Sequence, residues 1–150
     1  MKIYIRTYSG LTAIRKMPAS LRKFCQIHNF NEKNVRKAND GCRCGYLKSN
    51  LKEVLRDDWY ASTNVHLFYA HDGTRGLGWA MVTGKGRSAE INTYVLPRFR
   101  RKGVGTRILK KATAVCGAVE CALHDDRSIG FYKSLGATKN HRVTGKRIAA

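Results

Sequence analysis

The chain has 150 residues, of which 43% are hydrophobic, so it can bury a core of its own and is not expected to be disordered. Its 29 Lys and Arg residues against 10 Asp and Glu give a formal net charge of +19. No apolar run approaches the roughly 20 residues that span a bilayer, and the N-terminus lacks the apolar core of a signal peptide. We expect one soluble, cytoplasmic domain over residues 1–150, with no membrane partner.

The five cysteines are odd in number and do not form the framework of a secreted disulfide protein. Cys25 and His28, together with Cys42 and Cys44, offer four soft ligands that zinc could use. The Cys-x-Cys spacing is unusual for structural zinc, and Cys25 and His28 also fit the buried stripe of a helix. We therefore expect no metal, with zinc as the alternative.

The first part of the chain is predicted to form one strand and then helices. Residues 2–8 alternate as a strand does, and Pro18 suits the first turn of a helix. Apolar residues then recur at helical spacing, at Leu21, Phe24, Cys25 and His28. A further helix is indicated over residues 47–55.

Three strands joined by short turns follow, which predicts an antiparallel meander. The first strand covers residues 65–70 and ends in a hairpin turn with the Asp72-Gly73 signal. The second covers residues 76–83 and precedes a glycine turn at 84–86. The third covers residues 89–96, which are rich in β-branched and aromatic side chains and lack internal Gly or Pro.

A short basic loop with two glycines, Gly103 and Gly105, joins this third strand to a helix. The helix is indicated by an apolar stripe that runs from Ile108 to Cys116, and Gly117 is a candidate for its C-cap. Such a loop can aim backbone N–H groups and the positive end of the helix dipole at an anion, normally a phosphate. The loop therefore predicts a phosphate-binding site.

The last part of the chain is predicted to hold a strand over residues 119–123, a short helix carrying Phe131, Tyr132 and Leu135, and one more strand around residues 140–144. Gly136 is expected to close the short helix. The order of elements indicates an α+β fold with a mixed sheet.

The loop fits neither of the common nucleotide motifs. A Walker loop needs Gly-x-x-x-x-Gly-Lys followed by Ser or Thr, and this sequence lacks it. A dinucleotide fingerprint needs a third glycine where Ile108 stands, and it usually follows the first strand of a βαβ unit rather than a meander.

Two motifs resemble the GNAT (Gcn5-related) family of N-acetyltransferases. Residues 95–105 match Val-x-Pro-x-x-Arg-x-x-Gly-x-Gly, which is similar to the acetyl-CoA pyrophosphate loop of that family. Residues 128–137 are similar to the family's Asn-x-x-Ala-Ile-x-Leu-Tyr-x-x-Leu-Gly-Phe helix. Asp125, Ser128 and Ala137 depart from that second pattern, and an ionised Asp125 cannot donate the hydrogen bond of an amide.

The resemblance implies the GNAT fold, in which a largely antiparallel, twisted sheet of six or seven strands is flanked by four or five helices. It also implies an N-acetyltransferase that uses acetyl-CoA as co-substrate, by direct attack of an amine on the thioester. The family's pyrophosphate-binding residues fall on Arg100, Arg101, Lys102, Gly103, Val104, Gly105 and Thr106, and a further CoA contact falls on Asp125. Backbone groups of Thr93, Tyr94 and Val95 would pair with pantetheine and polarise the thioester carbonyl.

Direct attack needs an acid for the departing thiolate and a base for the ammonium. Tyr132 stands at the family's acid position and is expected to protonate the CoA sulfur as well as contact the cofactor. Glu120 and Glu90 are the two candidates for the base, because family members carry a glutamate in one or the other of these strands. His124 and Asp125 are weaker alternatives.

The net charge indicates an acceptor that is anionic or carried on something anionic, such as aminoacyl-tRNA, a ribosomal particle or an acidic protein. We therefore expect a macromolecular amine as acceptor, RNA or another polyanion as a partner, and a monomer or homodimer. The alternative is a binding module of the same fold that grips nucleic acid or a protein without acetyl transfer.

Overall fold

The computed structural model describes residues 1–27, 65–83, 89–121, 131–135 and 142–143. The helices and strands in these ranges are β1 (Tyr4–Ser9), α1 (Leu11–Arg15), α2 (Ala19–Ile27), β2 (Val65–His71), β3 (Gly76–Thr83), β4 (Glu90–Val95), the 3-10 turn η3 (Pro97–Phe99), α6 (Val104–Cys116), β5 (Val119–Cys121) and β6 (Arg142–Val143). Residues 131–134 form one further helical turn.

The described strands form one six-stranded sheet in the order β1-β2-β3-β4-β5-β6. Neighbours from β1 to β4 are antiparallel, β4 and β5 are parallel, and β5 and β6 are antiparallel. The predicted meander of β2, β3 and β4 is confirmed, and so is the mixed α+β class. The parallel pairing of β4 with β5 is short, with only the register pairs Glu90–Glu120 and Ile91–Cys121.

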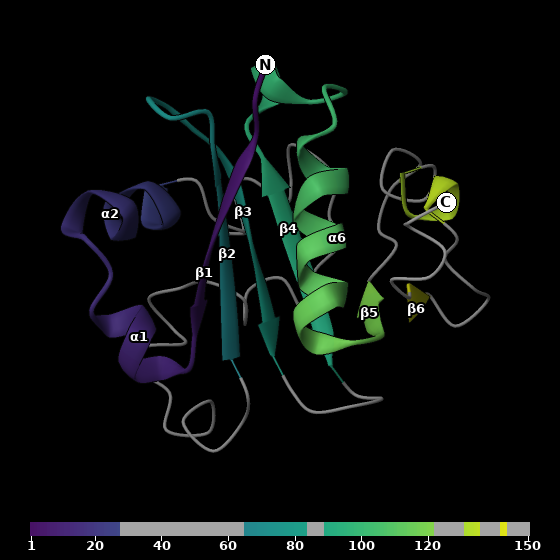
Figure 1. Ribbon diagram of the computed structural model, residues 1–150, viewed down its shortest axis with the longest axis horizontal. Helices are drawn as coiled ribbons and strands as arrows, with labels where there is room; N and C mark the ends of the chain where they lie inside the picture. Colours follow the sequence, from purple (N-terminus) through teal and green to yellow (C-terminus); the bar gives the residue numbers. More distant parts are fainter. Residues whose placement is uncertain (28–64, 84–88, 122–130, 136–141, 144–150) are drawn as a thin grey trace.

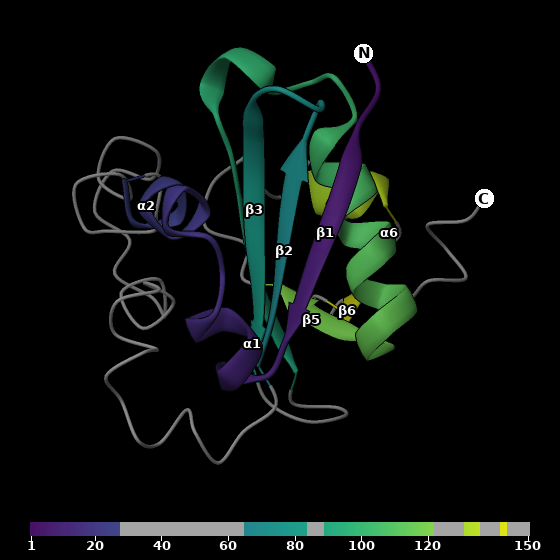
Figure 2. The same cartoon turned by 60° about the vertical axis from the view of Figure 1, so that its left-hand side comes forward.

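Helices lie on both sides of the sheet, with α1 and α2 on one side and α6 on the other (Figures 1 and 2). Each side has its own core. The core under α6 includes Phe68, Ala80, Ile91, Ile108 and Leu109, all at most 1% exposed. The core under α1 and α2 contains strand residues that alternate with these, Leu67, Tyr69, Trp79 and Met81, together with Ile14 of α1 and Cys25 of α2.

The α2 prediction is confirmed as far as the structure describes it. Cys25 is buried and Leu21 and Phe24 pack against the same core, as their spacing predicts. Helix α1 was not predicted, because its five residues are too few to display a helical period. Gly10, at φ 87°, turns the chain into α1, and Ile14 anchors that helix in the core. The helix expected over residues 47–55 lies outside the described residues.

The β2–β3 hairpin is organised by the side chain of Asp72. Its carboxylate accepts hydrogen bonds from the backbone N–H groups of Thr74 (2.9 Å) and Arg75 (2.7 Å) and forms a salt bridge with the Arg75 guanidinium (2.9 Å). These contacts, the backbone hydrogen bonds first, hold the pKa of Asp72 well below its usual range. The Asp-Gly signal thus marks a turn that its own side chain fixes.

None of the helices within the described ranges is long and apolar enough to cross a membrane.

Candidate acetyl-CoA site

The basic loop leaves β4 through η3 and enters α6 through two residues in the left-handed backbone region. Phe99 N–H bonds to the Leu96 carbonyl at 2.9 Å, which closes η3. Arg101 then has φ 61° and Gly103 has φ 85°, and α6 starts at Val104. Glycine takes this conformation without steric cost, whereas Arg101 is held in it against the preference of an L-residue.

This backbone path leaves a run of donors unused at the start of α6. Among the described residues, the N–H groups of residues 101–106 donate no hydrogen bond, and the first bond of the helix is made by Arg107 N–H to the Gly103 carbonyl (3.0 Å). Gly103 is the N-cap and offers no side-chain acceptor. A run of free N–H groups at the positive end of a 13-residue helix is a site for an anion, as the loop motif predicts.

The loop is braced against the β2–β3 hairpin through an aromatic ring. Phe99 is 4% exposed, and its ring is contacted by the guanidinium groups of Arg98 at 4.8 Å and Arg75 at 4.9 Å. Because Arg75 is also paired with Asp72, the hairpin and the loop are linked in one chain of contacts. No sequence pattern indicates this brace, since only the fold brings residue 75 beside residue 99.

The N-terminus lies at the same end of the sheet as the loop that leads into α6 (Figure 1). Several cationic residues belong to this end. The exposed ones are Lys2, Arg75, Arg98, Arg101, Lys102 and Arg107. Arg107 in addition donates to the Ile3 carbonyl at 3.0 Å, which ties α6 to the residue just before β1. The acidic side chain in this part of the described structure, that of Asp72, is already paired with Arg75, so the end of the sheet carries a strong positive excess.

Arg100, the arginine of the loop motif, folds back onto β4. Its Nε donates to the Val95 carbonyl at 2.9 Å, and its guanidinium lies 5.6 Å from the centroid of the Tyr94 ring. The side chain therefore fixes the end of the strand to the start of the loop. Its terminal nitrogens keep further donors for a bound anion.

On the side of β4 that faces β5, no described strand lies beside the residues that follow Ile91. Leu96 N–H bonds to Leu77 of β3, and the Ala89 carbonyl accepts from Glu120 of β5. Because successive residues of a strand direct their backbone groups to opposite edges, Thr93 and Val95 face the β5 side while Tyr94 faces β3. Of the three residues expected to pair with pantetheine, Thr93 and Val95 thus present backbone groups to the gap.

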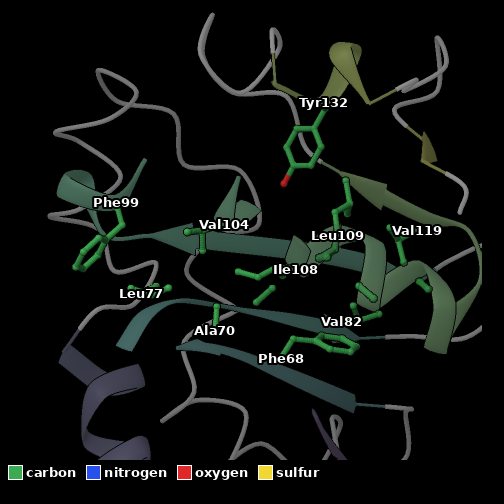
Figure 3. Close-up of a cluster of buried hydrophobic side chains, with 14 residues drawn as sticks. Phe68, Ala70, Leu77, Val82, Phe99, Val104, Ile108, Leu109, Val119 and Tyr132 are labelled. Atoms are coloured by element: carbon green, nitrogen blue, oxygen red, sulfur yellow. The ribbon is translucent and has the colours of Figure 1, made fainter. Parts of the chain in front are cut away.

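The two sequence motifs meet in space through Gly105 and Phe131. A Cβ built on Gly105 would lie 2.9 Å from Cζ of Phe131, so the ring packs directly on the first turn of α6. The Phe131 and Tyr132 rings are 5.0 Å apart in an edge arrangement. Tyr132 is 7% exposed and belongs to the core under α6. In Figure 3 its ring points from the short helix toward that core, with the hydroxyl oxygen at the leading end.

The two candidate bases, Glu90 and Glu120, are register partners on β4 and β5. Their neighbours Ala89 and Val119 are buried in the core under α6. The alternation along each strand therefore assigns positions 90 and 120 to the opposite face of the sheet, the face of α1 and α2. The two positions are adjacent at the point where β4 and β5 are still paired, just before the open edge of β4.

The remaining predicted positions divide between the described and undescribed parts of the chain. Asp125 and His124 lie outside the described residues, as do His28, Cys42 and Cys44 of the alternative zinc set. Cys25 is a free, buried thiol, and burial raises its pKa to about 12. Within the described ranges, no group of three or more His, Cys, Asp or Glu side chains could hold a metal ion.

The sequence pattern of the acetyltransferase (GNAT) family matches residues 32–137. A comparison of the sequence with curated proteins found no match.

Three solved structures illustrate the likeness of fold. The structure is similar to the PaiA N-acetyltransferase from Thermoplasma acidophilum in complex with coenzyme A, with a TM-score of 0.51 and 15% identity over 95% of this chain and 96% of that one. It is similar to AAC(6')-Iy in complex with the bisubstrate analogue CoA-S-monomethyl-acetylneamine, with a TM-score of 0.55 and 15% identity over 95% of both chains. It is also similar to the aminoglycoside acetyltransferase AAC(6')-Ib in complex with coenzyme A, with a TM-score of 0.52 and 12% identity over 99% of this chain and 98% of that one.

The structural likenesses bear on the fold, and the family match covers more than two thirds of the chain, including both motifs. The predicted fold and enzyme class are thereby confirmed. The chain belongs to the acetyltransferase (GNAT) family.

Proposed function

We propose that the chain transfers an acetyl group from acetyl-CoA to a primary amine on a macromolecular acceptor. The observation that carries this proposal is the run of free N–H groups over residues 101–106 at the start of α6. This run fits a pyrophosphate, which offers several oxygens to one continuous set of donors.

The positive side chains of the loop support the same assignment. Arg101 and Lys102 are exposed beside the free N–H groups, and Arg100 retains its terminal donors. Charge-assisted hydrogen bonds from such groups to phosphate oxygens are roughly twice as strong as neutral ones. The brace of Arg75 and Arg98 on Phe99 holds the loop in place before the ligand arrives.

The route of the cofactor follows from the open edge of β4. From the loop, a chain running beside β4 passes Val95 and Thr93 and reaches the paired positions of Glu90 and Glu120. Acetyl-CoA, when bound, supplies an activated acetyl group on a thiol leaving group. The N–H groups of Val95 and Thr93, free of any described strand, would hold that arm in an extended conformation.

The two proton transfers would take place on opposite faces of the sheet beside this edge. Tyr132, whose hydroxyl leads its ring inward from the α6 side, would deliver a proton to the leaving sulfur. Glu120 or Glu90, on the opposite face, would accept the proton of the incoming ammonium, directly or through water. The proton-donating Tyr132 and the acceptor amine would thus reach the thioester from different sides of the sheet.

The positive charge of the chain is the basis for the proposed class of acceptor. The exposed cations at the loop end and the net charge of +19 favour an acceptor that is itself anionic or attached to a polyanion, with RNA as a partner. The aminoglycoside acetyltransferases among the structural neighbours act on small polycations, which this surface would repel. We therefore place a protein or aminoacyl-tRNA amine ahead of a small-molecule amine.

Labelled acetyl transfer tests the proposal. The purified chain is incubated with radiolabelled acetyl-CoA and, in separate reactions, with a basic aminoglycoside, an acidic protein, ribosomes and aminoacylated tRNA. We expect incorporation into one of the anionic acceptors and loss of it in Tyr132→Phe. Binding of RNA without incorporation into any acceptor, in a chain that also fails to bind CoA, would favour the binding-module alternative.

A further inference from the structure

The hydroxyl of Thr93 is a buried polar group without a partner. Its Oγ1 is shielded from solvent and makes no hydrogen bond among the described residues. Thr93 lies opposite the buried Ala80 of β3, and it shares a face of β4 with Ile91, which is 1% exposed. A hydroxyl left unpaired in such surroundings costs free energy in the folded protein.

The position of this hydroxyl coincides with the proposed path of the cofactor. Thr93 stands two residues before the end of β4, on the edge that no described strand covers. Its side chain belongs to the α6 face, the same face from which Tyr132 enters the core. The residue therefore lies between the phosphate loop and the register pair Glu90–Glu120, and near the part of a bound CoA that carries amide and carbonyl groups.

We propose that the Thr93 hydroxyl is a hydrogen-bond partner of the pantetheine–thioester arm of CoA, satisfied only in the complex. The inference rests on the proposed function, and it adds a side-chain contact to the backbone contacts expected at this residue. The hydroxyl positions the arm relative to Tyr132 and takes no proton in the reaction.

A second unpaired hydroxyl supplies a matched control. Thr7 Oγ1 is also buried and without a partner among the described residues, on β1, where Thr7 pairs in register with Phe68 of the core under α6. Strands β2 and β3 separate β1 from β4, which places Thr7 roughly 14 Å from Thr93, at about 4.8 Å for each strand spacing. The two sites share chemistry and burial but differ in their proximity to the loop.

The test measures CoA affinity by isothermal titration for the wild type, Thr93→Val, Thr93→Ser and Thr7→Val, with the melting temperature of each variant without ligand. Valine keeps the shape of threonine and removes the hydroxyl, so both valine variants should melt at or above the wild-type temperature. We expect Thr93→Val to bind CoA about three- to tenfold more weakly, the value of one hydrogen bond, while Thr93→Ser and Thr7→Val bind as the wild type does.

A truncated probe locates the contact. Adenosine 3′,5′-bisphosphate carries two of the three phosphates of CoA, without the outer phosphate of the pyrophosphate, and lacks the pantetheine arm. Its affinity should be the same for the wild type and Thr93→Val. Equal CoA affinity in Thr93→Val and the wild type would overturn the inference and leave the proposed function standing. A weaker affinity that Thr7→Val or Thr93→Ser shares would also overturn it, because packing and not the hydroxyl would then be the cause. Failure of the wild type to bind CoA would instead refute the proposed function.

Discussion

Gly105 and Phe131 join the two halves of the site, since the Phe131 ring occupies the space that a side chain at position 105 would need. The contact is 2.9 Å from an ideal Cβ to Cζ of the ring, closer than packed carbon atoms tolerate. Gly105 thus leaves room for the Phe131 ring as well as for an anion. Through this contact, the first turn of α6 positions the short helix that carries Tyr132.

Replacing Gly105 with Ala should therefore force Phe131, and with it Tyr132, out of position. We expect a loss of about 1–3 kcal/mol in the free energy of unfolding, measured by urea titration, because inserted atoms in a packed site cause strain of that size. The rate of acetyl transfer should fall more than the affinity for CoA, because Tyr132, the proposed acid, is displaced while the phosphate loop keeps its position.

The control for this substitution is a double-mutant cycle with Phe131→Ala. If the ring causes the strain, Gly105→Ala should cost little in the Phe131→Ala background, where the space is open. An equal cost in both backgrounds would show that the glycine is needed for some other reason.

Charge reversal in the loop should weaken CoA binding strongly and locally. Arg101→Glu places a carboxylate beside the free N–H groups of the loop, so we expect at least a tenfold rise in the Kd for CoA, given roughly 1.5–3 kcal/mol for a hydrogen bond to a charged group. Lys110→Glu makes the same change in net charge at an exposed position of α6 further along the helix. It should alter the Kd by less than about twofold at physiological salt, because such a distance is largely screened.

Removing the Tyr132 hydroxyl should slow the chemistry and leave binding almost intact. Tyr132→Phe keeps the ring in the core, so we expect kcat to fall by roughly 10²-fold or more, the scale of a lost general acid, with the Kd for CoA unchanged within about threefold. Steady-state kinetics with the acceptor found by labelling, together with CoA titration, separates the two effects. A normal kcat in this variant would remove Tyr132 from the mechanism.

The hairpin that braces the loop should lose its contribution to stability in acid. Asp72 has a depressed pKa in the folded protein, so its stabilising effect is present above its unfolded pKa of about 3.9 and is lost as the pH falls below that value. Asp72→Asn should be less stable than the wild type near neutral pH, and the difference should shrink as both are titrated toward about pH 2. Thr74→Val removes only the hydroxyl contact and keeps both backbone donors, so it should follow the wild-type pH profile.

Much of this fold could be predicted from local patterns. The strands β1 to β5 and helices α2 and α6 follow from alternation, helical stripes and turn residues such as Gly73 and Gly117, because these signals depend on neighbours along the chain. Helix α1 was not predicted because a helix of one and a half turns is too short to show a helical repeat of apolar residues.

The site was predicted only in part, for a similar reason. The phosphate loop is a local motif and could be recognised in the sequence. The brace of Arg75 on Phe99, the pairing of Glu90 with Glu120 and the unpaired hydroxyl of Thr93 depend on which strands become neighbours. A single sequence does not show directly which strands become neighbours in the sheet.

The central claim, that the backbone at the start of α6 holds the pyrophosphate of CoA, can be tested amide by amide. The chain has a mass of 16.9 kDa, which suits a two-dimensional ¹⁵N–¹H NMR titration with CoA. We predict that the largest shifts fall on the amides of residues 101–106, with further shifts at Thr93 and Val95 along the open edge of β4. Saturable CoA binding that leaves the amides of residues 101–106 unmoved would contradict it.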